Sequence, residues 1–97
     1  VLGRVKILAI FRTEKDFMIA GGVVLDGKIV DKKKFHISRD KAVVGEGKIE
    51  ELQQSKVEVE EVTKDREFGM KVKTRIPLVV GDFLEVYDET VKKGELN

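Results

Sequence analysis

The stretch Phe17–Val30, FMIAGGVVLDGKIV, decides the fold of this 97-residue chain. Its β-branched and aromatic residues predict a strand over Phe17–Leu25 that is interrupted by Gly21-Gly22. Asp26-Gly27 is the strongest hairpin signal in the sequence, so Lys28–Val30 should pair back on that strand. Glycine weakens a strand, and this pair therefore indicates a barrel-corner bend or a close approach of a ligand.

The chain on either side carries further short strand patterns, separated by turn residues. Strands are expected at Gly3–Phe11, Lys34–Arg39, Ala42–Val44, Gly47–Leu52, Glu67–Val72 and Phe83–Tyr87. The helix-favouring composition of Lys48–Glu61 is the one ambiguity, and we expect a strand to about Leu52 and then a loop. Short strands at regular intervals predict an all-β barrel or sandwich.

The length of the chain fits a single domain with one modest core. We predict a β-barrel domain over residues 1–88 and a flexible, polar C-terminal tail over residues 89–97, because the tail has no periodic apolar face. Val1 enters a strand pattern almost at once, which suggests a piece of a longer protein.

Charge is balanced overall, since 19 basic residues face 18 acidic ones. This balance argues against a duplex-binding protein. Locally the chain is bipolar: six basic residues face two acidic ones over Lys28–Lys41, and eight acidic residues face four basic ones over Glu46–Glu67. Both stretches are interpreted first as solvated surface.

Few residues are suited to catalysis. The chain has one histidine, His36, no cysteine, and only Ser38 and Ser55 as serine nucleophiles, none in a recognisable triad pattern. We therefore expect no enzyme activity, no metal site and no cofactor. The absence of cysteine fits a reducing compartment, and the apolar runs are too short to span a bilayer, so a cytoplasmic location is expected.

Three ordered segments, Ile19–Ile29, Phe35–Asp40 and Gly45–Ile49, resemble the carboxy-terminal domain of bacterial translation initiation factor two. The match continues through Glu67 and Gly69 to a closing Gly-Asp pair and covers the chain from about Gly3. The resemblance implies a six-stranded antiparallel barrel like domain II of elongation factor Tu.

The same resemblance implies a function. In that family the domain binds the formyl-methionyl acceptor end of initiator transfer RNA, as a monomeric, non-catalytic part of a larger factor that works on the ribosome. The factor is a GTPase, and its GTP-binding domain is not in this chain. A degenerate barrel that docks on a protein or the ribosome, without recognising initiator transfer RNA, is the alternative.

Residues that match the family motif are expected to bind the acceptor end. They are Lys56, Glu67, Gly69, Gly22, Phe68 and Arg66. The family's two cysteines are replaced here by Gly22 and Phe68, which predicts that the phenylalanine ring fills a space beside Gly22. The family's Lys-Arg-aromatic-Lys is here Gln53–Lys56, which predicts weaker and less salt-dependent binding.

Overall fold

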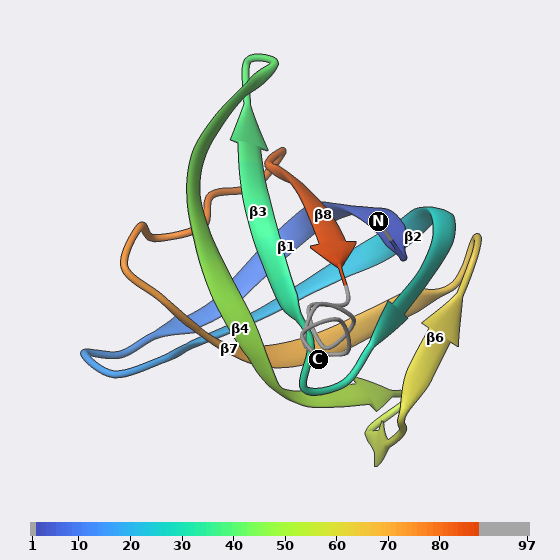
Figure 1. The fold of residues 1–97 in the computed structure, drawn as a ribbon. Helices are drawn as coiled ribbons and strands as arrows, with labels where there is room; N and C mark the ends of the chain where they lie inside the picture. The colour runs from blue at the N-terminus through green and yellow to red at the C-terminus, as the bar shows by residue number, and fades with distance from the viewer. Residues whose placement is uncertain (1, 88–97) are drawn as a thin grey trace, which may run out of the picture.

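The computed structural model describes residues 2–87, which form eight strands and, within that range, no helix (Figure 1). The strands are β1 Gly3–Thr13, β2 Met18–Val30, β3 Lys34–Arg39, β4 Ala42–Gln54, β5 Val57–Glu58, β6 Glu61–Thr63, β7 Glu67–Thr74 and β8 Phe83–Tyr87. The predicted domain end at residue 88 and the predicted tail lie outside the described residues. Among residues 2–87 no helix is long and apolar enough to cross a membrane.

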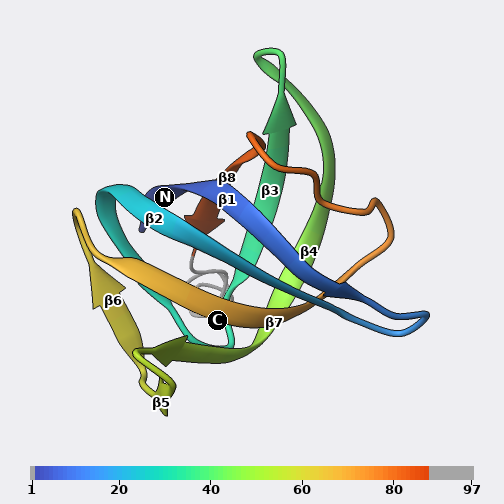
Figure 2. The ribbon, with the colours of Figure 1, turned by 180° about the vertical axis from the view of Figure 1, so that it is seen from behind.

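Six of these strands close into a barrel. They are ordered β1-β8-β3-β4-β7-β2, every pairing is antiparallel, and a final β1–β2 pairing completes the circle. Strands β1 and β2 cross the molecule side by side (Figure 2). The short strands β5 and β6 pair antiparallel with the C-terminal ends of β4 and β2, respectively. The predicted all-β class and six-stranded barrel are confirmed.

Alternate residues of the six barrel strands contribute to the interior. In Lys34–Arg39 the alternation of Phe35 and Ile37 with polar residues predicts one buried and one solvent-facing side. The structure confirms this, because Phe35 and Ile37 are fully buried while His36 between them is only partly covered. Inward side chains from the other strands complete one core, including Ile7, Ile49 and Leu84. This period of two places every second residue of a strand on the outer surface.

The predicted hairpin at Asp26-Gly27 is wrong, since β2 continues through it to Val30. Gly27 has φ +65° and faces Gly3, and a methyl group on Gly27 would lie 2.2 Å from the Leu2 carbonyl oxygen. Beyond this point β2 leaves β1 and pairs with β6. The two residues therefore mark an irregularity where the strand changes partner, not a reversal of the chain.

Two further expectations about turns had different outcomes. The polar pair Asp40-Lys41 predicts a turn after Lys34–Arg39, and the structure has one there: both residues have positive φ, 55° and 68°, and join β3 to β4. The loop expected after Leu52 is wrong: β4 is continuous to Gln54 and turns tightly through Ser55 and Lys56, with φ 54° and 67°, into β5. Positive φ at both central residues suits the twist of a two-residue hairpin.

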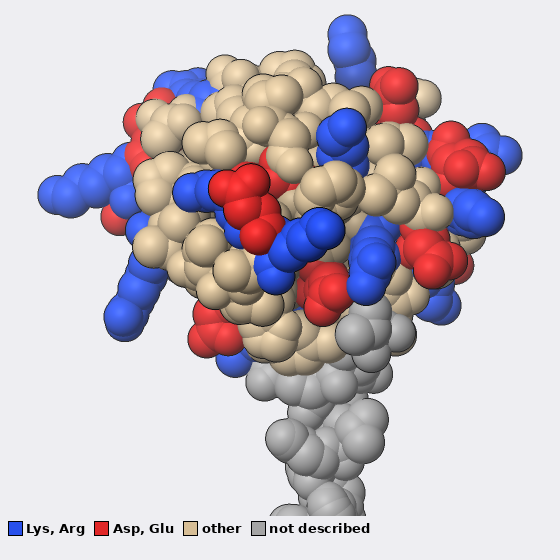
Figure 3. Space-filling view, turned by 90° about the horizontal axis from the view of Figure 1, so that it is seen from above, with Lys and Arg blue, Asp and Glu red and all other residues tan. Residues whose placement is uncertain are grey.

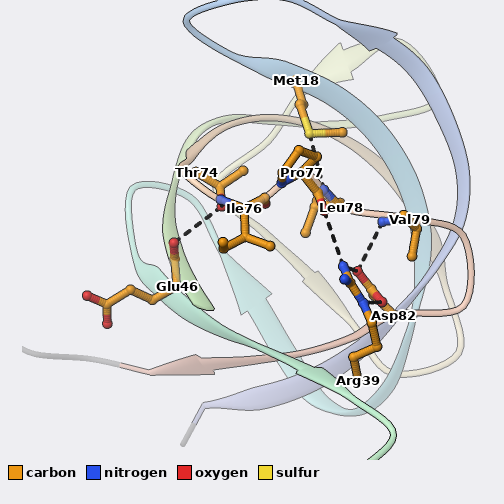
Figure 4. A network of polar contacts seen from close by, with 9 residues as sticks. All are labelled: Met18, Arg39, Glu46, Thr74, Ile76, Pro77, Leu78, Val79 and Asp82. Carbon is orange, nitrogen blue, oxygen red and sulfur yellow. Dashed lines mark hydrogen bonds and ion pairs between the residues drawn. The ribbon is translucent and has the colours of Figure 1, made fainter. Parts of the chain in front are cut away.

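A buried carboxylate fixes the connection from β7 to β8 (Figure 4). Arg39 donates hydrogen bonds to both Asp82 carboxylate oxygens, at 2.8 and 2.7 Å, and the Val79 N–H donates a third at 3.0 Å. Burial by itself would raise the pKa of Asp82, but the Arg39 and Val79 hydrogen bonds and the Arg39 charge together lower it below its ordinary value. Asp82 thus ties this loop to the end of β3.

Candidate functional site

The six predicted site residues lie on and around strands β2, β7 and β4, but they divide between the two faces of the sheet. On β7, Gly69 pairs with Gly21 of β2 on one side and with Gln53 of β4 on the other. Phe68, one residue earlier, pairs with Gly22. Because neighbours on a strand point to opposite faces, Gly69 is on the outer surface and Phe68 is inside.

The outer face around Gly69 is bare. A methyl group added to Gly69 would have no other atom within 4 Å, whereas one added to Gly21 would lie 2.9 Å from the ring of Phe11. Phe11 is itself 67% exposed. The ring of Phe11 therefore covers Gly21, which is buried, whereas the backbone at Gly69 is open.

The inner face at Gly22 is closed. A methyl group on Gly22 would lie 2.3 Å from the Lys6 carbonyl oxygen and 3.2 Å from Cζ of Phe68. The ring of Phe68, which is 5% exposed, therefore lies beside the space where a Gly22 side chain would be, as the sequence predicts. Gly22 and Phe68 thus lie behind the sheet, and neither forms part of the outer face around Gly69.

Two of the remaining predicted residues, Arg66 and Glu67, line an open hollow near Gly69. It is lined by Gln54, Ser55, Lys64, Asp65, Arg66 and Glu67. Lys56 is exposed in the same turn as Ser55. The two cations of the hollow are balanced by its two carboxylates, so the hollow itself has no net charge to attract phosphate.

Backbone hydrogen bonds hold the segment before β7 against β2. The Asp65 N–H donates to the Val24 carbonyl at 2.8 Å, and the Val24 N–H donates to the Arg66 carbonyl at 3.1 Å. Asp65 has φ 70°, which reverses the chain just before Glu67. The fixed turn places Arg66 and Glu67 beside the end of β4.

This surface offers accessible backbone at Gly69, one exposed aromatic ring and hydrogen-bonding side chains. Among residues 2–87 there is no group of three side chains that could hold a metal ion. Phe11 is not predicted as a site residue from the sequence, because register shifts between Ile7 and Ala9 and between Ile10 and Arg12 decide where its ring lies. No local pattern in the sequence indicates those shifts.

A separate groove lies beside the hydrogen-bonded pair of Arg39 and Asp82, which we call the Asp82 latch. None of the six predicted site residues lines this groove. Its apolar lining comes from Leu25, Val79, Val80 and Phe83. Viewed from the barrel end where the β3–β4 turn lies, the surface is mostly uncharged, with basic and acidic side chains interspersed (Figure 3). No surface of a single charge sign occupies this view.

Comparison with known proteins finds relatives over nearly the whole chain. No protein-family model matches. Translation initiation factor IF-2 of Citrifermentans bemidjiense is 38% identical over 95 residues, covering 98% of this chain and 10% of the relative. The Aquifex aeolicus IF-2 is 36% identical over 96 residues, with 99% and 12% covered. The chain thus spans about a tenth of the length of these relatives.

A solved structure has the same fold. The S. cerevisiae Ski7 GTPase-like domain, bound to GDP and inorganic phosphate, superposes with a TM-score of 0.65 over 92% of this chain and 24% of that one. The two sequences are 14% identical, so this likeness concerns the fold alone.

Proposed function

This chain is related over nearly its whole length to a part of translation initiation factor IF-2, and we propose that it binds the formyl-methionyl acceptor end of initiator transfer RNA. The proposal makes it a non-catalytic domain. In a complete factor it would accompany a GTP-binding domain and act on the ribosome in the cytoplasm.

The open outer face at Gly69, beside the Phe11 ring that covers Gly21, is the observation that carries the proposal. Packing inside the described barrel does not require a glycine at position 69, because a methyl group there would touch nothing. Gly69 is paired with strands on both sides, so its backbone groups are used by the sheet, but a carbonyl oxygen on this open face has a second lone pair that can accept a hydrogen bond from the N–H of the formyl amide. The flat face over Gly69 also leaves room for the ester and the formyl amide of the ligand. These groups are uncharged, and so lose little hydration at such a surface.

Neighbouring side chains suit the rest of an acceptor end. The exposed ring of Phe11 offers a face on which a base can stack, an interaction worth about 1–3 kcal/mol per base. Glu67 precedes Gly69 by two residues on the same face, and its carboxylate accepts hydrogen bonds of the kind that ribose hydroxyls donate.

Titration of the fluorescently labelled 97-residue chain tests the proposal. The ligands are initiator transfer RNA carrying formyl-methionine, carrying methionine, and deacylated. We expect the formylated form to bind most tightly and the deacylated form most weakly. Equal affinity for all three forms would contradict acceptor-end recognition.

The apolar groove favours a second candidate, a docking domain without initiator transfer RNA recognition. Val80 is 61% exposed and Phe83 is 40% exposed, which is a surface suited to a protein partner. Under this alternative none of the three RNA forms binds, while replacement of Val80 by aspartate would weaken association with the ribosome or with the factor's other domains.

A further inference from the structure

A second open hollow, of about 860 Å³, lies at the other end of the β4–β7 pairing. Its charged lining is mostly basic, with five cations against two carboxylates: Lys15, Lys34, Lys48, Lys73 and Arg75 against Asp16 and Glu46. One of the carboxylates, Glu46, is 3.7 Å from Nε2 of His36. We call this surface the basic hollow.

Three lysines of the basic hollow lie at opposing positions on neighbouring strands, where their positive charges repel one another. Lys48 of β4 is directly opposite Lys73 of β7, and directly opposite Lys34 of β3 on its other side. Like charges in opposing positions destabilise a sheet, since their Cβ atoms are only about 5 Å apart. Within residues 2–87, Lys48 and Lys73 form no ion pair that would offset this cost.

A line of residues on the outer face of β7 joins the basic hollow to Gly69. Gly69, Lys71 and Lys73 are alternate residues of β7 and share its outer face, with steps of about 7 Å between them. The Lys71 ammonium lies over the ring of Phe17, 4.7 Å from its centre. This spacing resembles that of successive phosphates along an extended RNA strand.

We propose that the basic hollow binds phosphates of the RNA strand whose 3′ end is held at Gly69, an inference that rests on the proposed function for the position of that end. The charge is spread over three strands and along β7, which suits a polyanion better than a single small anion. Binding there would relieve the repulsion between Lys48 and Lys73.

The test uses a ten-nucleotide single-stranded RNA without an aminoacyl group, alongside formyl-methionyl initiator transfer RNA. The variant Lys48→Gln/Lys73→Gln removes two charges from the basic hollow. Lys32→Gln/Lys41→Gln is the matched control, since both of its lysines are exposed and neither lines the hollow. Affinities are measured for each protein over a range of salt concentrations.

For both RNAs we expect the variant to bind about tenfold more weakly at low salt. Its salt slope should fall by roughly 1.4, because each lost single-strand phosphate contact removes about 0.7. The control should keep the slope of the original protein. Equal changes in variant and control, or no change in the variant, would overturn the inference.

The two probes separate this inference from the proposed function. Oligonucleotide binding that depends on Lys48 and Lys73, without preference for formyl-methionyl RNA, supports the phosphate site and contradicts acceptor-end recognition. Binding that depends on the formyl group but is unchanged in the Lys48→Gln/Lys73→Gln variant supports acceptor-end recognition and contradicts the phosphate site. If neither RNA binds, both the phosphate site and acceptor-end recognition are contradicted. The melting temperature gives a further check: at low salt it should rise in the variant, where repulsion is removed.

Discussion

Gly22 and Gly69 lie on paired strands of the same barrel and face opposite sides of the sheet. Inside, glycine is needed at position 22 because any Cβ would lie 2.3 Å from the Lys6 carbonyl oxygen. Outside, no atom lies within 4 Å of a Cβ at position 69. Packing thus accounts for the inner glycine and leaves the outer one without a structural reason, which makes Gly69 the better candidate for a functional residue.

Replacing Gly22 should have the largest effect. Gly22→Cys introduces a clash with the Lys6 backbone as well as with the Phe68 ring, and should lower the free energy of unfolding by about 3 kcal/mol in urea denaturation. The double variant Gly22→Cys/Phe68→Cys should recover less than half of this loss, because the clash with Lys6 remains. Full recovery would show that the ring alone excludes a side chain, and strict additivity would show no shared pocket.

Disruption of the Asp82 latch should destabilise the barrel without touching the glycine face. Asp82→Ala removes three hydrogen bonds from a buried position, and should lower the free energy of unfolding by about 2 kcal/mol while RNA affinity stays unchanged. A parallel loss of affinity in the folded variant would mean that the site extends to this end of the barrel.

The same latch predicts a pH dependence. The folded-state pKa of Asp82 is below its ordinary value of 3.8, so the stabilisation is present above about pH 4 and is lost as the pH falls through the lower folded-state pKa. Melting temperatures measured from pH 5 down to pH 2 should therefore fall more steeply for the original protein than for Asp82→Asn. Equal slopes would show that the carboxylate is not stabilised by Arg39.

Enlarging Gly69 should weaken ligand binding with little effect on stability, whereas enlarging Gly22 should mainly lower stability. Gly69→Leu places a side chain over the bare backbone and should weaken binding of formyl-methionyl initiator transfer RNA at least tenfold, or about 1.4 kcal/mol. The free energy of unfolding should change by less than about 0.5 kcal/mol, because nothing is displaced. Tight binding by the folded variant would remove Gly69 from the site.

The smallest effect concerns the neutral hollow beside Gly69. Gln53→Lys/Gln54→Arg restores two cations of the family's basic cluster, and should steepen the salt dependence of RNA binding by roughly 1.4. Gln53→Ala/Gln54→Ala, which adds no charge, is the matched control. A slope equal to that of the control would mean that these positions do not face phosphate.

Sequence alone was sufficient for the strands whose patterns are local. The alternation around Phe35 and Ile37 predicts the buried face of β3 correctly. Asp26-Gly27 failed as a hairpin signal because the outcome depends on β6, a partner more than thirty residues later. A dipeptide specifies a backbone conformation, but the strands that pair with its flanks decide whether the chain reverses.

The site shows the same division between local and distant information. The family motif brought Glu67 and Gly69 to attention, whereas the contact of Phe11 with Gly21 depends on β-bulges that no motif marks. The basic hollow could not be predicted from the sequence either, because its lysines come from four separate segments of the chain. The most basic stretch of the sequence, Lys28–Lys41, contributes only one of them.

The most direct test of the outer glycine face is amide NMR of the isotopically labelled chain, titrated with a formyl-methionyl ester of adenosine. This ligand contains the acceptor end and no extended RNA strand. We expect the largest shifts at the amides of Gly21, Gln53 and Gly69, with little change at Val80 and Phe83. Shifts centred on Val80 and Phe83, or none at Gly69, would contradict the account.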